Sequence, residues 1–226
     1  MIAAATGFAA AALSVSPVRI RLGGASSRTI TIRNAGNAAA AVEARLGSFV
    51  LDRRGKPTIA REHQPAAGWL RVQPRRLVLA PGGTAVVTVS SSAPAGAVPG
   101  DHAALVLLTT QPRHAAGVAV RMRIGVVVFV RVAGRIVHRL ELGALKVRRR
   151  VLEAAVANRG NVVERVRVHV SLWRGGHLLV RLGSVARTLL PHSRGIERFR
   201  YRGRVHGLLT ARVEMGRLRR IFRVRL

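Results

Sequence analysis

The pair Asp101-His102 is the part of the sequence with the clearest potential for catalysis, because a carboxylate beside an imidazole can orient it as a general base. Neighbouring side chains of a strand point to opposite faces, however, and Pro99-Gly100 just before the pair predicts a turn. No Gly-x-Ser-x-Gly elbow or other nucleophile motif accompanies the pair. We therefore expect Asp101 to cap a turn and assign no catalytic residue.

The other residue types that carry chemistry form no recognisable site. The chain has no cysteine, which excludes disulfides, thiolate nucleophiles and cysteine-bound zinc. Its 8 histidines lack ligand spacing, its 9 carboxylates form no paired-acid motif, and no glycine-rich loop with a lysine is present to hold a phosphate. The sequence thus predicts a protein with no metal, no cofactor and no enzymatic activity.

Basic residues are numerous enough to attract any polyanion. Lys and Arg total 39 against 9 Asp and Glu, a formal net charge of +30. Nearly all are arginines, as a GC-rich genome would also produce, so the charge has a compositional explanation beside a functional one. Two clusters are candidate sites for wall polyanions: Lys146, Arg148, Arg149 and Arg150 in one, and Arg217, Arg219 and Arg220 in the other. The alternative is solvated charge on loops or strand edges that blocks aggregation.

Aromatic residues make up only 4% of the chain, and its two tryptophans have different surroundings. Trp69 opens an apolar run and is expected in the core. Trp173 falls on the polar side of its strand beside Arg174, where it could stack on a sugar or fill a domain interface. With few stacking platforms and arginines spread over many strands, we expect no specific nucleic-acid binding, only salt-dependent attraction.

Apolar and polar residues alternate along most of the chain, which is the pattern of half-buried strands. In residues 18–22 the apolar side chains share one face and Arg19 and Arg21 the other. Residues 118–124 alternate in the same way against Arg121 and Arg123. Short strands with no helical period between them predict an all-β protein of antiparallel, immunoglobulin-like β-sandwiches. No segment is long and charge-free enough for a transmembrane helix.

The same landmarks occur twice, which predicts two tandem sandwiches. Asn34-Ala35-Gly36-Asn37 is answered by Asn158-Arg159-Gly160-Asn161, and Leu79-Ala80-Pro81 by Leu189-Leu190-Pro191. Asn and Gly tolerate positive φ, so we expect the Asn-x-Gly-Asn elements to reverse the chain between strands. We predict domains at residues 14–133 and 134–226, after an apolar, signal-peptide-like segment at residues 1–13 that lacks a basic beginning.

The motifs of the first predicted domain resemble a known family. They are Val15-Ser16-Pro17, the Asn34 turn, the run from Trp69 to Pro74, the run from Leu79 to Gly83, Pro99-Gly100-Asp101-His102 and an apolar closing strand. Together they resemble the peptidoglycan-binding domain of the WxL-interacting surface proteins and, more distantly, the N-terminal immunoglobulin-like domain of pilus-type chaperones. The resemblance covers residues 15–132 and implies an exported protein associated with the wall, although the family's C-terminal membrane helix is not found here.

The likeness to chaperones implies one binding residue. Those proteins hold the terminal carboxylate of a partner with a basic residue on the first strand, a position that Arg21 takes here, with Arg19 on the same face. A second basic residue late in the last strand is missing, since residues 125–128 are apolar. This departure argues against a chaperone.

The leading expectation is a non-catalytic binding or adhesion protein of the cell envelope, exported to the cell exterior or wall, that associates with peptidoglycan, wall polymers or another surface protein. The first alternative is a periplasmic-type assembly chaperone that donates a strand edge to its partner. The second is a non-specific binder of polyanions or nucleic acids, suggested by charge alone. The residues expected to bind are Arg19, Arg21, Trp173 and the two basic clusters.

Overall fold

The computed structural model describes residues 12–60, 65–115, 118–201 and 205–226 of the 226-residue chain, with side chains described except at 113–119. Strands make up nearly all the regular secondary structure of these residues, with one short helix, α1 (Pro65–Gly68). The predicted all-β sandwich class is confirmed. The signal-peptide-like segment lies outside the described residues except for positions 12 and 13. Among the described residues, no helix is long and apolar enough to cross a membrane.

Contacts between Cα atoms divide the chain into two compact units. The first comprises Met1–Phe49 and Ile59–Ala133, and the second comprises Val50–Thr58 and Gly134–Leu226. The second unit thus takes in a short segment from the first half of the chain. That the two units are domains able to fold alone stays a prediction.

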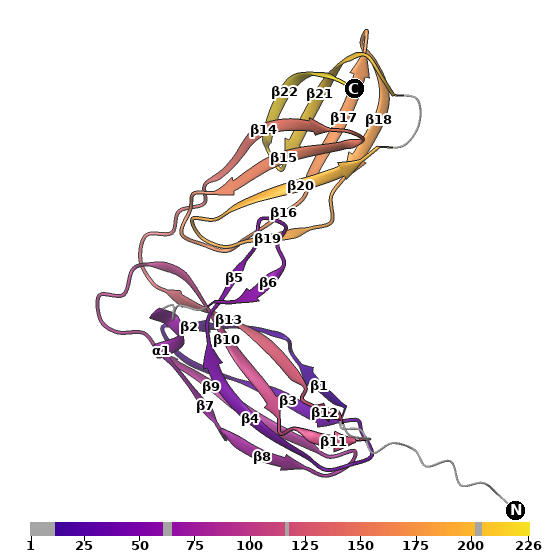
Figure 1. Ribbon diagram of the computed structural model, residues 1–226. Coiled ribbons are helices and arrows are strands. Elements are labelled where there is room, and N and C mark those ends of the chain that lie inside the picture. The colour runs from indigo at the N-terminus through magenta and orange to yellow at the C-terminus, as the bar shows by residue number, and fades with distance from the viewer. Residues whose placement is uncertain (1–11, 61–64, 116–117, 202–204) are drawn as a thin grey trace, which may run out of the picture. The chain divides into compact units, whose positions relative to one another are not determined.

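The first unit is a sandwich of two sheets (Figure 1). Its strands are β1 (Leu13–Ser16), β2 (Arg19–Gly23), β3 (Ala25–Asn34), β4 (Ala40–Gly47), β7 (Leu70–Gln73), β8 (Arg76–Leu79), β9 (Thr84–Ser92), β10 (Gly100–Thr110) and β13 (Arg123–Val132). One sheet has the order β1-β3-β9-β7 and the other β2-β13-β10-β4-β8. A small hairpin of β11 (Arg113–Ala115) and β12 (Val118–Val120) joins β10 to β13.

Period-two alternation puts aliphatic side chains between these two sheets. Ile20 and Leu22 of β2 are buried, while Arg19 and Arg21 between them are exposed. The buried members of the core are all aliphatic, and Trp69, expected inside, packs against the core as a partly buried side chain. Burying one Val, Leu or Ile side chain contributes about 1.5–3 kcal/mol, so this core is built from many moderate contributions.

One strand pair departs from the predicted antiparallel pattern. β2 runs parallel to β13, with Arg19 opposite Val127 and Arg21 opposite Phe129. Upstream of β2 the chain leaves this sheet, because β1 pairs with β3 of the other sheet and Pro17 in between has no N–H for a ladder hydrogen bond. As a result, β2 covers only residues 127–131 of β13.

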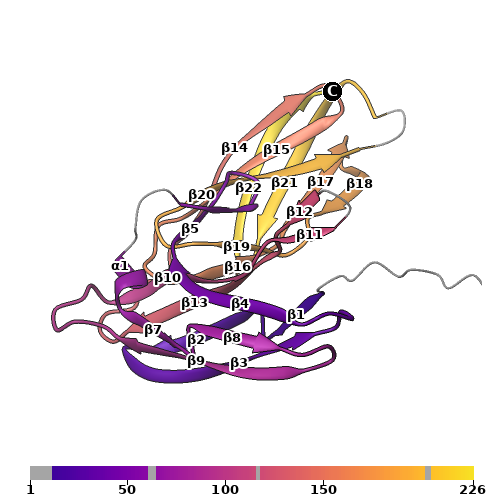
Figure 2. The ribbon, with the colours of Figure 1, turned by 60° about the horizontal axis from the view of Figure 1, so that its bottom comes forward.

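The second unit is again a sandwich. Its strands are β14 (Leu140–Arg148), β15 (Val151–Asn158), β16 (Glu164–Val166), β17 (Val168–Arg174), β18 (His177–Gly183), β19 (Arg187–Leu189), β20 (Arg194–Arg200), β21 (Leu208–Met215) and β22 (Leu218–Arg225). The layers have the orders β14-β15-β20 and β18-β17-β21-β22, and Figure 2 shows β14 and β15 over β21 and β22. A short pair, β16-β19, lies beside them, and the core includes Phe199 and Tyr201.

A buried asparagine ends the β3 strand of the first unit. Asn34 is 0% exposed, and its amide oxygen accepts the N–H of Gly36 over 3.1 Å. Its amide nitrogen donates to three backbone carbonyls over 2.7, 3.2 and 3.1 Å, those of Ala38, Leu79 and Ala80. One side chain therefore ties the Asn-x-Gly-Asn element to the Leu-x-Pro element, the two landmarks that the sequence repeats.

The second unit contains the same arrangement around Asn158, which ends β15. Its oxygen accepts the N–H of Gly160 over 2.9 Å, and its nitrogen donates to the carbonyls of Val162, Leu189 and Leu190. None of the asparagines or glycines of the two Asn-x-Gly-Asn elements has positive φ. The explanation predicted for these elements is therefore wrong, because they work through side-chain hydrogen bonds rather than through left-handed backbone.

A buried ion pair holds the segment from the first half of the chain in the second unit. β5 (Phe49–Leu51) and β6 (Pro57–Ile59) form a hairpin, and Arg187 donates from Nη2 to the carbonyl of Arg53 at its turn. Nη1 of Arg187 lies 2.8 Å from Oε1 of Glu197, and the two side chains are only 8% and 11% exposed. Each of these charges depends on the other, because an unpaired charge at such a position is strongly destabilising.

Candidate strand-edge interface

Residues 123–126 of β13 are paired with another strand on one side only. β10 pairs with β13 along its whole length, whereas β2 pairs only with residues 127–131. No strand in the described part of the chain pairs with the other side of residues 123–126. We call this open stretch, with residues 120–122 before it, the β13 edge. Unpaired N–H and C=O groups at a sheet edge are a template for an added strand.

Backbone hydrogen bonds identify the residues that face the β13 edge. The N–H of Val127 donates over 3.0 Å to the carbonyl of Val18, just before β2, whereas the C=O of Met122 accepts over 3.0 Å from the N–H of Thr110, the last residue of β10. Because backbone direction alternates with period two, the N–H and C=O groups of Arg123 and Gly125 point toward the β13 edge. These two residues supply the donors and acceptors that a further strand would need.

Side chains along the β13 edge separate into an apolar face and a basic face. Met122 and Ile124 are partly buried on the core side, and Val120 before them is 59% exposed. Arg121 and Arg123 alternate with them and are exposed. A strand added here would meet aliphatic side chains on one face and guanidinium groups on the other.

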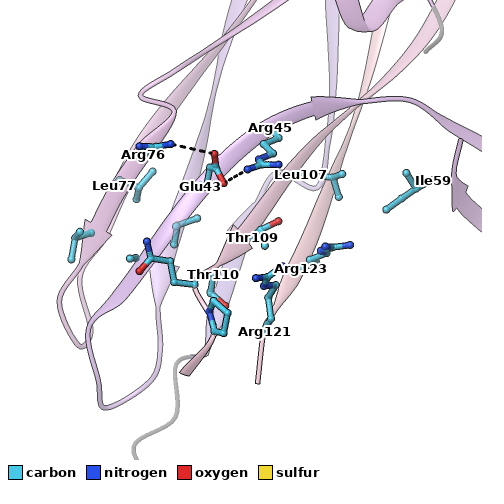
Figure 3. A pocket seen from close by; sticks show the side chains of 15 residues that line it. Glu43, Arg45, Ile59, Arg76, Leu77, Leu107, Thr109, Thr110, Arg121 and Arg123 are labelled. Atoms are coloured by element: carbon cyan, nitrogen blue, oxygen red, sulfur yellow. Dashed lines mark ion pairs between the residues drawn. The ribbon is translucent and has the colours of Figure 1, made fainter. Parts of the chain in front are cut away.

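The basic face borders an open hollow of about 800 Å³ on the outer surface of the sheet (Figure 3). Pairing register places Arg123, Thr109 and Glu43 side by side on three neighbouring strands. The charged residues that line the hollow are Glu43, Arg45, Arg76, Arg121 and Arg123. Four arginines against one glutamate give the lining a formal charge of +3. Anionic groups are therefore attracted to this side of the edge.

Glu43 neutralises the arginines that lie farther from the β13 edge. Its Oε2 lies 2.9 Å from Nη2 of Arg45, and its Oε1 lies 3.9 Å from Nη2 of Arg76. The hydrogen bond from Arg45, with the charges of both arginines, holds the pKa of Glu43 below its ordinary value of 4.5 against the opposing effect of desolvation. Arg121 and Arg123 have no carboxylate partner among the described residues. They are the uncompensated charges beside the open strand.

The arginines predicted to bind on the first strand lie beside the other half of β13. Arg21 is exposed opposite Phe129, and the guanidinium of Arg19 lies 5.9 Å from the centre of the Phe129 ring. The prediction that the last strand lacks a late basic residue is wrong, since Arg131 follows Phe129 by two positions and forms a two-point ion pair with buried Asp101. The position of Arg131 directly after the apolar run 126–130 could have identified it from the sequence.

The pair Asp101-His102 lies within β10 rather than in the predicted turn, and its side chains have separate partners. Nε2 of His102 lies 2.7 Å from the carbonyl oxygen of Val98, and its ring meets the Trp69 ring edge-on with 4.7 Å between centres. The Asp101 carboxylate is taken up by an arginine instead of orienting the imidazole. No group of three or more His, Cys, Asp or Glu side chains suited to a metal lies in the described part of the chain.

The two basic clusters of the second unit both involve β14, which carries Lys146 and Arg148. Arg220 donates to the carbonyls of Leu142 and Gly143 near its start, whereas Arg149 and Arg150 follow its end. The other members are exposed side chains, two of them in surface ion pairs with glutamates: Lys146, Arg148, Arg217 and Arg219. The role of both clusters in binding stays a prediction.

Trp173 is partly buried on the outer side of β17. Its Nε1 donates to Oγ of Ser171 over 3.0 Å, and the guanidinium of Arg212 lies 5.1 Å from its ring centre. An arginine therefore already stacks on this ring, a cation–π contact worth about 0.5–1 kcal/mol at an exposed site. A sugar would have to use the remaining ring surface.

Comparison with known proteins gives a likeness of fold but no relative in sequence. No protein-family model matches the chain, and no curated protein does. Among solved structures, the YadV chaperone matches at TM-score 0.55 and 11% identity, over 94% of this chain and 99% of that one. The Salmonella enterica SafA pilin–SafB chaperone complex gives TM-score 0.53, 13% identity and coverage of 95% and 96%. The CsuC–CsuE pre-assembly complex of Acinetobacter baumannii Csu pili matches at TM-score 0.51 and 12% identity, over 94% of this chain and 97% of that one.

These matches correct the leading expectation from the sequence. The expectation of a protein that binds peptidoglycan or wall polymers is contradicted, because the matching structures are chaperones, two of them in complex with a pilin or a pilus tip subunit, and each match covers at least 94% of this chain. The resemblance to WxL-interacting proteins and an association with the wall find no support. The more distant likeness to pilus chaperones is confirmed at the level of the fold. The matching structures belong to the class of protein that the first alternative named, an assembly chaperone.

Proposed function

We propose that this protein is an exported assembly chaperone that binds another surface protein by adding its β13 edge to the partner's sheet. The observation that carries the proposal is the open backbone at Arg123 and Gly125, set between an aliphatic and a basic row of side chains. Strand addition derives affinity from main-chain hydrogen bonds and specificity from alternate side chains. The β13 edge offers both.

The solved structures support the proposal through their fold and their partners. SafB is a chaperone in complex with a pilin, and CsuC is a chaperone in complex with a tip adhesion subunit. At 12–13% identity the likeness concerns architecture, so the choice of interface on this chain rests on its own β13 edge. The apolar beginning of the sequence supports export.

The arginines explain how such an edge stays open without self-association. An exposed strand with aliphatic side chains is an aggregation hazard, and charged residues on edge strands are a common protection. If two copies paired through their β13 edges, Arg121 and Arg123 of one copy would lie beside the same residues of the other. Like charges directly opposite each other destabilise a strand pair. The edge is therefore suited to a different partner rather than to a second copy.

Proline at position 123 tests the proposal by removing one edge donor. The N–H of Arg123 points away from β10, so its loss breaks no hydrogen bond of the sheet, and proline is tolerated at such positions. Arg123→Thr is the matched control, because it removes the charge equally and keeps the N–H. Tagged wild-type protein and both variants are purified from the producing cells after chemical cross-linking, and bound proteins are quantified by mass spectrometry.

We expect a stoichiometric surface-protein complex with the wild type, a complex of reduced yield with Arg123→Thr, and at least tenfold less with Arg123→Pro. Circular dichroism and thermal unfolding verify that both variants keep the fold. Equal recovery of the partner with Arg123→Pro and Arg123→Thr would show that the β13 edge is not the interface.

A further inference from the structure

We infer, resting on the proposed function, that the partner strand captured at the β13 edge alternates acidic with apolar side chains, its carboxylates facing Arg121 and Arg123. The inference identifies the partner by its chemistry. It follows from the row structure of the sheet, from the distribution of charge around the hollow, and from the contrast between the two faces of the edge.

The row structure determines which side chains an added strand presents to the hollow. Arg123, Thr109 and Glu43 form one outward-facing row across β13, β10 and β4. Neighbouring strands lie about 4.7–4.9 Å apart, so a strand added beyond β13 extends this row by one position. Its outward side chain at that position lies next to Arg123, and the one two residues along lies next to Arg121 or Gly125.

The charge distribution determines which side chain is favourable there. Arg45 and Arg76 already share the carboxylate of Glu43, whereas Arg121 and Arg123 have no such partner in the described part of the chain. In Figure 3 these two arginines lie across Thr109 from the Glu43 group. A carboxylate on the added strand would supply the missing charge, while a lysine or arginine would meet like charge directly opposite.

The other face of the added strand meets a different environment. Met122 and Ile124 are partly buried on the core side, and Val120 is 59% exposed with its aliphatic side chain in solvent. Covering these side chains removes apolar surface from water, which favours apolar residues at alternate positions of the partner. The recognised strand is therefore apolar toward the core and acidic toward the hollow.

Three nine-residue peptides test this pattern: one alternating Val with Glu, one alternating Val with Gln, and one alternating Val with Lys. Their binding is measured by fluorescence anisotropy at low and at high salt. We expect the Glu peptide to bind roughly tenfold more tightly than the Gln peptide at low salt, as two cross-strand ion pairs allow, and the Lys peptide to bind most weakly. The difference should shrink as salt rises.

A charge-reversal pair separates the hollow from the general attraction of a +30 protein for anions. Arg121→Glu/Arg123→Glu changes the net charge as much as the control Arg28→Glu/Arg71→Glu, whose exposed positions lie on β3 and β7 of the other sheet. The first variant should prefer the Lys peptide over the Glu peptide, and the control should keep the wild-type order.

The remaining outcomes distinguish a failure of the acidic preference from a failure of strand addition itself. If the Gln peptide binds as tightly as the Glu peptide and Arg123→Pro abolishes both, the acidic preference is refuted and strand addition stands. If the control reversal weakens the Glu peptide as much as the edge reversal, the hollow has no special role and the inference is overturned. If no peptide binds and Arg123→Pro still recovers the cellular partner, the proposed function itself is refuted.

Discussion

Replacing Asn158 with alanine should unfold the second unit at a much lower temperature and leave the first unit unchanged. The side chain is 0% exposed and makes four hydrogen bonds, of 2.7, 3.2, 3.4 and 2.9 Å. Each lost bond costs about 1 kcal/mol, and buried groups left without partners cost more, so we expect a loss of about 3–5 kcal/mol. For a unit of this size, that corresponds to a fall in Tm of roughly 15–30 °C.

The two tryptophans make the assay specific to each unit. Trp69 belongs to the first unit and Trp173 to the second, so a Trp69→Phe background reports on the second unit alone and a Trp173→Phe background on the first. Thermal unfolding is followed by fluorescence in both backgrounds. Thr210→Ala, at an exposed position of β21, is the control for a surface change in the same unit.

Asn158→Asp separates hydrogen bonding from side-chain volume. Aspartate keeps the shape and the acceptor for Gly160, but turns a second oxygen toward the carbonyls that the amide nitrogen now binds. It should therefore destabilise the second unit at least as much as alanine. A fall in Tm below about 5 °C for Asn158→Ala would refute the role given to this residue, and equal shifts of both reporters would refute two independently folding units.

Three further predictions concern ion pairs and the carboxylate of the hollow. Arg187→Met should cost about 3–5 kcal/mol in the second unit because it leaves Glu197 buried without its partner, and adding Glu197→Leu should restore most of this in urea unfolding. Arg45→Gln should move the NMR titration of Glu43 to higher pH, since the Arg45 hydrogen bond is the main cause of its lowered pKa. Because this pKa is lowered, the ion pairs of Glu43 contribute stability above about pH 4.5, and this contribution is lost as the pH falls through the pKa of the folded state. In the Arg45→Gln variant, the free energy of unfolding should therefore decrease less between neutral and acidic pH than in the wild type.

The sequence was sufficient to predict the fold class, because period-two alternation is a local property. Ile20 and Leu22 against Arg19 and Arg21 predict a strand with one buried face, and the structure has it. The repeated asparagines were recognised as landmarks, but their role was not. The hydrogen bonds of Asn158 reach residues 31 and 32 positions away, and only the folded chain brings them together.

The open edge could not be predicted because strand order is not a local property. Alternation in residues 118–124 predicts a strand with a basic face, but Arg121 and Arg123 become candidates only when β2 is seen to begin beside Val127 and to leave residues 123–126 uncovered. Among the predicted binding residues, Arg19 and Arg21 lie beside the same strand, while Trp173 and the basic clusters belong to the other unit. Consecutive arginines are easily found in a sequence, but only the folded structure shows which arginines have no carboxylate partner.

Site-specific photo-cross-linking tests the use of the β13 edge most directly. The chain has no cysteine, so Val120→Cys and Val86→Cys can each carry a single benzophenone probe. The two valines belong to the first unit and are similarly exposed, at 59% and 53%, but only Val120 lies on the β13 edge. On illumination of the producing cells, we predict a discrete adduct with a surface protein from position 120 and none from position 86. Equal adducts from both positions, or an adduct from position 86 alone, would contradict strand addition at this edge.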